Sequence, residues 1–515
     1  MIIIILDLKD EALTKRANYT FSQIMSYLGY EYEIINNATK NFVNNKKYSL
    51  LIYYGGNLSY IKNKINTIQI ISKSSKKFNT IQKKLYSFKN KRTVIFNRDI
   101  ILEAFNILAR QEEIDSENVD KHRRFIAKKS KIFKHLKEPI VNEYAIILDK
   151  LIKKLHYNDK IPLVQKCSWP ENKKFAVCLT HDVDVVKFVL SDFAKAGKIV
   201  DFIKGENPYW QFDKIVELEK NFNFKSTFFF CPGKKHRLDP NYSIKDRKIL
   251  DLIKQLIKDG KEIGVHLSYL SYNDKSMMLH EKNEVYGLAG KKIGARTHFL
   301  RFDVPKTWIL EDEIGLYYDS SLGYPGHTGY RSGFCWPYHP YIAGHEKELD
   351  IFELPLSVMD STLFAESRTE ENAMKLLQGL FDNIEKYNGL VVMNWHQRVF
   401  NEKYFIGWAS VYKKCLEYFK AKEVFASSAE NVLNWIANRD LLDISETIDS
   451  NILKIKLNPR AKVNGFALKL ENVEKSKLKI AGTGDYSIKE QNNCINIIFG
   501  KIGKNSTVIL EIRKD

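Results

Sequence analysis

The pattern of apolar and polar positions divides the chain into three parts. In residues 1–165, short apolar runs alternate with amphipathic stretches, which predicts an N-terminal α/β domain. The expected strands are Ile2–Leu6, Tyr32–Ile35, Leu50–Tyr54, Ile68–Ile71 and Thr93–Phe96, and the expected helices are Ile100–Arg110 and the basic stretch 121–156.

Residues 166–440 again show strands separated by helices, which is typical of a parallel sheet or barrel. The first strand opens the stretch Phe175–Asp184, which begins apolar and ends polar. The other expected strands are Ser226–Phe230, Glu262–His266, Arg296–Phe302, Tyr317–Ser321, Phe352–Met359 and Leu390–His396. About seven strands favour a distorted, incomplete (β/α) barrel over an open sheet.

Residues 441–515 change character. Short runs such as Ile452–Leu457 and Val508–Ile512 alternate apolar with polar residues and are divided by Gly and Asn. Strands at this spacing predict a small antiparallel, sandwich-like accessory domain. The fold class is therefore α/β, with a barrel between an N-terminal α/β domain and a C-terminal all-β domain.

Polar residues follow the apolar strands of the central part. Asp182 and Asp184 end the first strand, and His266, His298 and His396 lie at or near the ends of later ones. Alternate residues of a strand share a face, so the two carboxylates point the same way. Such strand ends converge at one mouth of a barrel. A single carboxylate could simply cap the next helix, and a single histidine could be a structural residue, but the recurrence favours a site.

Carboxylate and imidazole groups with open positions suit a catalytic divalent metal, most simply zinc. Such an ion activates a bound water as the nucleophile, a second carboxylate can accept the proton of that water, and a histidine can protonate the leaving group. These parts make a metal-assisted amide or ester hydrolase.

The same motifs resemble the polysaccharide deacetylase family, carbohydrate esterase family 4. Thr180–Asp184 resembles its opening Thr-Phe-Asp-Asp motif, Ser226–Phe229 its Ala-Thr-Phe-Phe, and Glu262–His266 its Glu-Ile-Gly-x-His. Arg301–Pro305 resembles its Arg-x-Pro motif, and Trp395-His396 its terminal Leu-x-His. The N-terminal part resembles an uncharacterised domain that accompanies a bacterial subgroup.

The resemblance implies hydrolysis of an N-acetyl group on a sugar. By motif position, Asp182 is the general base, Asp184 and His266 are metal ligands, and His396 is the general acid. Arg301 would orient or polarise the catalytic carboxylate.

The sequence departs from the family pattern in two places. Val183 separates the two aspartates, and the second metal histidine of the family is replaced by Leu270. Either another residue supplies the third ligand, or catalysis is lost. The next predicted strand carries His298, which we expect to be that ligand, although a histidine bonded within the strand layer is an equal alternative.

Aromatic residues crowd the later loops, and aromatic faces pack on sugar rings. The candidate substrate-binding aromatics are Trp308, Tyr324, Trp336 and Trp395. Arg331 is a candidate for an anionic substrate group, with a structural salt bridge as the alternative. We expect roughly half of these aromatics to line the groove, and the alternative is that most of them are core residues.

Charge and composition narrow the function classes. The net charge of +19 comes from lysines spread over the whole chain, in a sequence rich in Ile, Asn and Lys as an AT-rich genome would encode. Without a nucleic-acid motif, we expect no nucleic-acid partner. Six cysteines with no C-x-x-C pair, no signal-peptide pattern and no transmembrane segment predict a reduced, cytoplasmic protein.

The function expected from the sequence is therefore a metal-dependent carbohydrate N-deacetylase of glycan biosynthesis, with an amino sugar or glycan precursor as substrate. Two alternatives stay open at this stage. One is hydrolysis of a non-sugar C–N bond on the same fold, and the other is a catalytically inactive glycan-binding module. No feature of the sequence indicates an oligomeric state.

Overall fold

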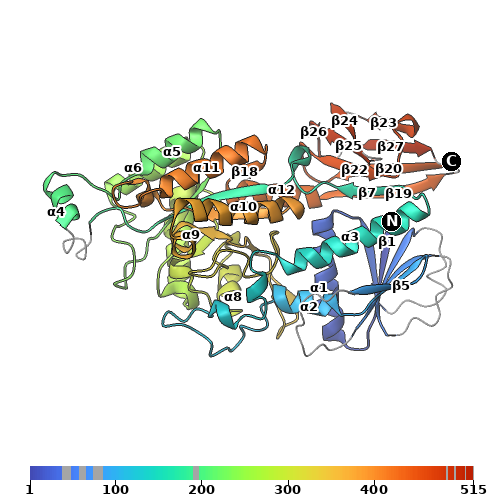
Figure 1. The fold of residues 1–515 in the computed structure, drawn as a ribbon, viewed down its shortest axis with the longest axis horizontal. Helices are drawn as coiled ribbons and strands as arrows, with labels where there is room; N and C mark the ends of the chain where they lie inside the picture. The colour runs from blue at the N-terminus through green and yellow to red at the C-terminus, as the bar shows by residue number, and fades with distance from the viewer. Residues whose placement is uncertain are drawn as a thin grey trace.

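The structure is a computed structural model. It describes residues 1–36, 48–56, 65–72, 85–188, 196–449, 451–482, 485–491, 494–504 and 506–513. Figure 1 shows the N-terminal sheet, the curled central sheet and the C-terminal strands as three neighbouring parts of the molecule. No helix among these residues is long and apolar enough to cross a membrane.

The N-terminal domain is a sheet with the strand order β2-β1-β3-β4-β6-β5, parallel except for the β5–β6 pair. Its strands are β1 Ile2–Asp7, β2 Tyr32–Asn36, β3 Leu50–Gly55, β4 Asn66–Ile71, β5 Tyr86–Asn90 and β6 Thr93–Phe96, and its helices are α1 Glu11–Leu28, α2 Ile100–Leu108 and α3 Ile140–Asn158. Local signals set the ends of α1. The Asp10 carboxylate accepts a hydrogen bond from the Leu13 backbone, and Gly29 takes the left-handed conformation that ends the helix.

The expected helix over 121–156 is wrong in its first half. Residues 109–139 contain only short 3-10 turns, and α3 starts directly after Pro139, which stands at the N-cap position. The intervening segment 109–138, called the connecting segment below, instead spreads over the central domain. Proline is unfavourable inside a helix because it lacks the backbone donor, so it separates the two conformations.

The central domain is a curled parallel sheet, as expected for an incomplete barrel (Figure 1). Its strand order is β15-β12-β11-β10-β9-β8-β17-β16, with β18 also paired to β8. The strands are β8 Ala176–Val183, β9 Thr227–Phe230, β10 Glu262–Leu267, β11 Ala295–Thr297, β12 Tyr318–Asp319, β15 Phe352–Glu353, β16 Val358–Met359, β17 Leu390–Asn394 and β18 Phe425–Ser427.

Helices cover the outside of this sheet, and apolar residues of seven of them pack with the sheet into a buried core. These seven are α5 Phe212–Asn221, α6 Arg247–Lys258, α7 Lys275–Ala289, α8 Lys306–Glu313, α9 Asp360–Ser367, α10 Glu370–Lys386 and α11 Trp408–Ala421. The apolar residues of α12 Ala429–Asp440 belong to the core shared with the N-terminal sheet, and α4 Ala196–Ile203 projects from the domain with Phe202 and Ile203 exposed. A short antiparallel hairpin, β13 Tyr341–Ile342 with β14 Lys347–Glu348, lies between β12 and β15.

The C-terminal residues contribute to two antiparallel sheets with the orders β19-β20-β27-β23 and β24-β25-β22-β7, and to a small pair, β21-β26. These strands are β19 Leu442–Asp449, β20 Ile452–Pro459, β21 Val463–Asn464, β22 Ala467–Glu471, β23 Leu478–Gly482, β24 Tyr486–Gln491, β25 Cys494–Phe499, β26 Lys501–Ile502 and β27 Val508–Arg513. The strand β7, Leu163–Lys166, comes from the junction of the first two parts and pairs with β22. One continuous apolar core runs from the N-terminal sheet to these strands.

Candidate active site

The first strand of the central sheet carries both aspartates. All residues of β8 are buried, and the alternation of its side chains sends His181 into a hydrogen bond with Glu219 on the helix side. Asp182, near the end of β8, and Asp184, directly after it, both line one pocket. The two carboxylates therefore lie at one site, as the alternation in the sequence predicts.

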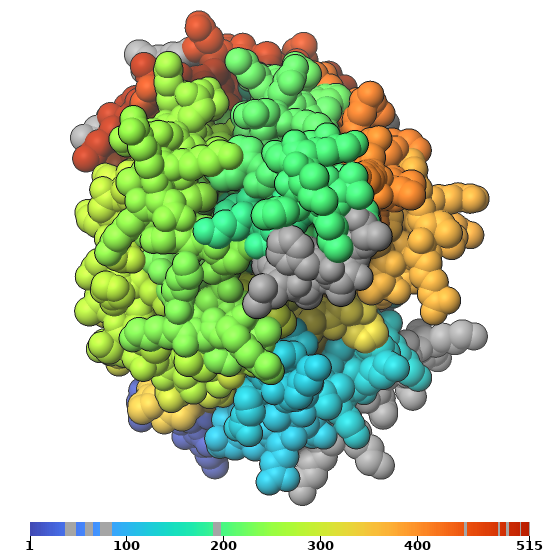
Figure 2. All heavy atoms as spheres, turned by 90° about the vertical axis from the view of Figure 1, so that its left-hand side faces the viewer, coloured from blue at the N-terminus to red at the C-terminus, as the bar shows by residue number. Residues whose placement is uncertain are grey.

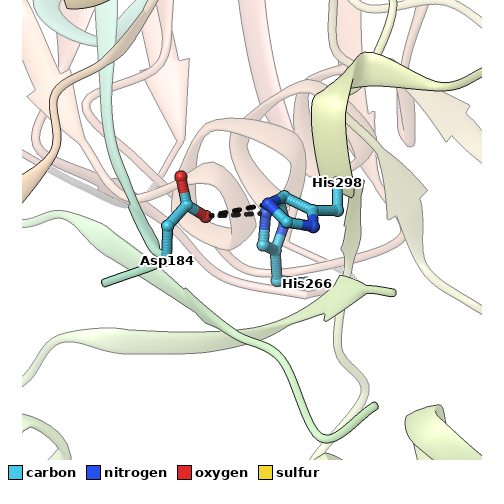
Figure 3. A group of neighbouring side chains, drawn as sticks. All are labelled: Asp184, His266 and His298. Atoms are coloured by element: carbon cyan, nitrogen blue, oxygen red, sulfur yellow. Dashed lines mark ion pairs between the residues drawn. The ribbon is translucent and has the colours of Figure 1, made fainter. Parts of the chain in front are cut away.

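Asp184, His266 and His298 converge on one point (Figure 3). The Nε2 atoms of His266 and His298 lie 3.2 and 3.7 Å from Oδ1 of Asp184. A tetrahedral site with metal–ligand bonds of about 2.0–2.1 Å separates its ligand atoms by about 3.3 Å. The expected approach of His298 to the other two residues is confirmed, and Leu270 plays no part in it.

The neighbours of these three side chains fit them as metal ligands. Nδ1 of His266 lies 2.9 Å from the carbonyl oxygen of Arg296, so it donates there and leaves the lone pair of Nε2 directed at Asp184. Oδ1 of Asp184 is buried without a hydrogen-bond partner. An unpartnered buried acceptor within the ligand triangle is what a cation would satisfy.

His298 reaches this position because its strand ends early. β11 stops at Thr297, and Phe299 and Leu300 both have positive φ values, 63° and 52°. This turn takes Arg301 away from the strand face that carries Arg296 and His298. The sequence predicts a regular strand that extends to Phe302. In such a strand the side chains simply alternate between the two faces of the sheet.

The structure corrects the expected role of Arg301, which does not lie beside the catalytic carboxylate. Arg301 Nε donates to the carbonyl of His122 at 2.9 Å, its Nη1 donates to the carbonyl of Tyr269, and its guanidinium stacks on the ring of Tyr269. Arg296, fully buried on β11, takes the place next to Asp182, with 3.5 Å between Nη1 and Oδ1. The role of Arg296 could have been predicted from the sequence, because alternation along the strand puts Arg296 and His298 on one face.

Asp182 is held by groups that leave one oxygen free. Asn394 Nδ2 donates to Oδ2 of Asp182 at 2.7 Å, and the backbone N–H of Asp182 donates to Oδ1 of Asn394 at 3.1 Å. Oδ1 of Asp182 accepts no hydrogen bond from the described residues, and Nη1 of Arg296 lies 3.5 Å from it. Asp182 lines the pocket, where this oxygen can accept a proton.

His396 lies on the other side of Asp184. Its Nε2 is 3.1 Å from Oδ2 of Asp184, and its Nδ1 is 2.8 Å from Oδ1 of Asp360. The other oxygen of Asp360 accepts the backbone N–H of His396 at 2.8 Å. Asp360, which is fully buried at the start of α9, was missed from the sequence although it directly follows β16. The rule that polar residues follow the strands would have found it.

Burial and charge set the protonation of this cluster. Burial would raise the pKa of Asp184, but the imidazoles of His266, His396 and His298 around it lower it well below its usual value. Burial lowers the pKa of His298 to about 4, which leaves its imidazole neutral and able to bind a cation. Burial also acts to lower the pKa of His396, but the charge of Asp360 outweighs it and the pKa rises to about 10.

The substrate-binding residues expected from the sequence are not at this site. All five are buried in the structure, because large aromatic rings and a paired guanidinium fill the interior. Trp308 donates to Glu353, Trp336 packs on Trp169 with 4.7 Å between ring centroids, and Trp395 packs on Tyr412. Arg331 forms a buried ion pair with Glu113, with Tyr324 beside it, which is the salt-bridge alternative.

The pocket above the cluster has a volume of about 260 Å³. Its lining joins the catalytic candidates to the connecting segment and to the loops after β11 and β17. The lining residues are Arg124, Asp182, Asp184, His266, Thr297, His298, Phe299, Leu300, Pro325, Gly326, Met359, Ser361, Thr362, Ala365, His396 and Arg398.

Comparisons with known proteins add the following. Residues 6–157 match DUF7033, a family of unknown function. No curated protein matches the chain. The match to DUF7033 covers the N-terminal domain and the connecting segment, and so includes Arg124.

Three solved structures match the chain at low similarity. A protein assigned as a polysaccharide deacetylase from Mycobacterium smegmatis is 19% identical, with a TM-score of 0.40 over 55% of this chain and 98% of its own. Agd3, described as a novel carbohydrate deacetylase, is 8% identical, with a TM-score of 0.38 over 99% and 98% of the two chains. A family 4 carbohydrate esterase from Bacillus anthracis is 14% identical, with a TM-score of 0.26 over 51% and 84%.

Proposed function

We propose that the protein is a metal-dependent carbohydrate N-deacetylase. The observation that carries the proposal is the geometry of the cluster. Asp184, His266 and His298 form a triangle of metal-ligand atoms, and the free oxygen of Asp182 and the imidazole of His396 flank it in one pocket. A base and an acid on either side of a ligand triangle are the parts that amide hydrolysis needs.

Asp184, His266 and His298 would hold a divalent ion, most simply zinc, because the set of one carboxylate and two imidazoles suits it. Such an ion polarises an acyl oxygen and makes water a better nucleophile at neutral pH. The pocket buries the ligand side chains, so an ion there would act in a medium of low dielectric constant.

Asp182 would take the proton from the attacking water through its free Oδ1. The hydrogen bond from Asn394 fixes the orientation of this carboxylate, and the Arg296 guanidinium lies beside it. Arg296 is itself positioned by Ser320, whose hydroxyl accepts a hydrogen bond from Nη2 at 3.0 Å.

His396 would give a proton to the departing amine. The carboxylate of Asp360 fixes the ring through Nδ1, which leaves Nε2 directed into the site, and favours the protonated imidazole that an acid must be. Acid and base would thus lie on opposite sides of the scissile C–N bond.

The proposal is tested by measuring acetate release from N-acetylated sugars together with the metal content of the protein. Asp182→Asn is expected to abolish turnover and keep the metal, whereas Asp184→Asn is expected to lose both. Exposed Asp350→Asn serves as the matched control. Equal metal loss in the Asp182 and Asp184 variants would contradict the division of roles.

One observation favours a second candidate, hydrolysis of a non-sugar C–N bond. Apart from the histidines, Phe299 is the one aromatic residue among the described residues that line the pocket. Sugar sites commonly offer an aromatic face. The substrate panel therefore includes N-acetylated amino acids and small amides, and release from these alone would replace the sugar with the second candidate.

A further inference from the structure

The connecting segment of the N-terminal domain reaches the mouth of the central sheet. Glu113 of this segment forms a buried ion pair with Arg331, and the carbonyl of His122 accepts a hydrogen bond from Arg301. Figure 2 shows residues near 100–140 (cyan) packed against the central domain (green to yellow). The N-terminal domain is therefore placed to contribute side chains to the pocket.

Arg124 is the side chain that it contributes. It lines the pocket together with both aspartates and the histidines of the cluster. Asp120 pairs with its Nε and Nη2 at 2.8 and 2.7 Å, and its Nη1 donates to the carbonyl of Phe299 at 2.9 Å. These three contacts fix the guanidinium and still leave N–H groups on both terminal nitrogens.

Arg398 lines the pocket from another direction. It lies two residues after His396 and is partly buried. Its guanidinium has no hydrogen bond or ion pair with a side chain in the part of the chain that the structure describes. A partly buried arginine without a counter-charge next to a substrate pocket is a recognition group for a carboxylate or phosphate.

The balance of charge in the pocket points the same way. Arg124 and Arg398 offset the two carboxylates of the lining, Asp182 and Asp184, and just outside the lining the charge of Asp120 beside Arg124 is offset by that of Arg296 beside Asp182. Three histidines complete the set of titratable groups among the described lining residues, so these residues include no carboxylate besides Asp182 and Asp184. A divalent ion on the ligand triangle would therefore leave the lining with a net positive charge, which attracts anions.

We infer that the substrate of this site is an N-acylated sugar that carries an anionic group, and that Arg398 and Arg124 bind this group. The inference rests on the proposed function for the sugar and its acyl group, but the anion recognition stands on the two arginines. The pocket volume of about 260 Å³ lies just below the usual range for ligand pockets. This size limits the bound part of the substrate to about one sugar ring and its charged substituent.

The decisive experiment measures binding in the absence of turnover. Full-length Asp182→Asn protein, loaded with zinc, is titrated calorimetrically with three ligands of the same ring. These are neutral N-acetylglucosamine, N-acetylglucosaminuronic acid with a carboxylate, and N-acetylglucosamine 6-phosphate. The two anionic ligands distinguish a carboxylate from a phosphate as the natural group.

We expect at least one anionic ligand to bind roughly tenfold or more tightly than the neutral one. The binding free energy contributed by one hydrogen bond to a charged group corresponds to an affinity difference of about this size. Arg398→Gln in the same background should remove most of this preference, and Arg398→Lys should keep part of it. Arg124→Gln should reduce it further. The matched control is Arg123→Gln, which removes an equal charge from an exposed neighbour outside the pocket lining.

Equal affinity for all three ligands would overturn the inference, as would a preference that survives Arg398→Gln. A loss of the same size in Arg123→Gln would assign the preference to the general positive charge of the protein and also overturn it. Thermal unfolding of each variant shows whether it is folded, and the Arg398 side chain has no hydrogen bond or ion pair to lose among the described residues. Turnover without anion preference would leave the proposed function standing, whereas anion preference without turnover of any substrate would leave only this inference.

Discussion

The contact between Asp360 and His396 gives the sharpest prediction about the chemistry. Asp360 is fully buried, and both of its oxygens bond to His396, one to Nδ1 and one to the backbone N–H, each at 2.8 Å. Asp360→Asn keeps the shape of the side chain and a bond to the backbone. It removes the negative charge that stabilises the protonated imidazole.

The magnitude follows from one charge-assisted hydrogen bond, which contributes about 1.5–3 kcal/mol. At 1.36 kcal/mol per factor of ten, kcat should fall roughly 10- to 150-fold, with little change in KM. The metal content should stay normal, because neither Asp360 nor His396 belongs to the ligand triangle.

The pH profile supplies an independent readout. Burial alone would lower the pKa of His396, and the Asp360 carboxylate raises it to about 10. An acid must be protonated, so the raised pKa keeps His396 active to higher pH. Asp360→Asn lowers that pKa, and the alkaline limb of kcat/KM should move to lower pH.

The assay is initial-rate acetate release across pH for the zinc-loaded wild type, Asp360→Asn and the exposed control Asp350→Asn. An unchanged kcat with an unmoved alkaline limb in Asp360→Asn would refute the role of this pair. A large rise in KM alone would also refute it, because it would place His396 in substrate binding.

Three further predictions concern metal, stability and domain structure. His298→Ala should lose bound zinc as fully as Asp184→Asn, as measured by elemental analysis; normal zinc content in the histidine variant would remove it from the ligand set. Burial opposes the ionised form of Glu113, but Arg331 and Arg110 lower its pKa to about 2, so Glu113→Gln should cost about 3 kcal/mol of unfolding free energy at pH 7. That stabilisation is present above the ordinary pKa near 4.5 and is lost as the pH falls toward 2, and a variant as stable as the wild type in urea at pH 7 would contradict it. A chain ending at Asp440 loses β22, the partner of β7, and should melt at a lower temperature while folded molecules keep their turnover; loss of turnover in well-folded protein would show that the C-terminal strands complete the site.

The sequence predicts those parts of the fold that depend on local pattern. Strands such as Leu50–Tyr54 and Leu390–His396 are continuous apolar runs, because both faces of a parallel strand are buried, and the structure places them within one or two residues. The apolar spacing of residues 121–138, in the connecting segment, predicts a helix that the structure does not have. The conformation of the connecting segment depends on distant partners such as Arg301 and Arg331, which no local pattern reveals.

The candidate site shows the same limit. Asp182, Asp184, His266 and His396 follow strands in regular positions, so sequence order brought them together correctly. The predicted position of Arg301 is wrong because the chain turns at Phe299 and Leu300, where both residues have positive φ values. Non-glycine residues seldom adopt such values, so the residue types there do not predict a turn.

The predicted substrate-binding role of the aromatic residues is wrong for a different reason. A tryptophan looks the same in sequence whether it lines a groove or fills a core, and only packing decides. Trp308 illustrates this point, because its indole N–H finds the buried carboxylate of Glu353, far along the chain. The polar partner of a buried aromatic is a tertiary contact.

The central claim is that a metal held by Asp184, His266 and His298 enables the hydrolysis of an N-acetyl group. The most direct test is acetate release from a panel of neutral and anionic N-acetylated sugars by the full-length protein, before chelation, after chelation and after zinc is restored. We predict release from at least one sugar, loss of that release on chelation, and its recovery with one zinc per chain. Folded, zinc-loaded protein that releases no acetate from any of them, or release that chelation leaves unchanged, would contradict the account.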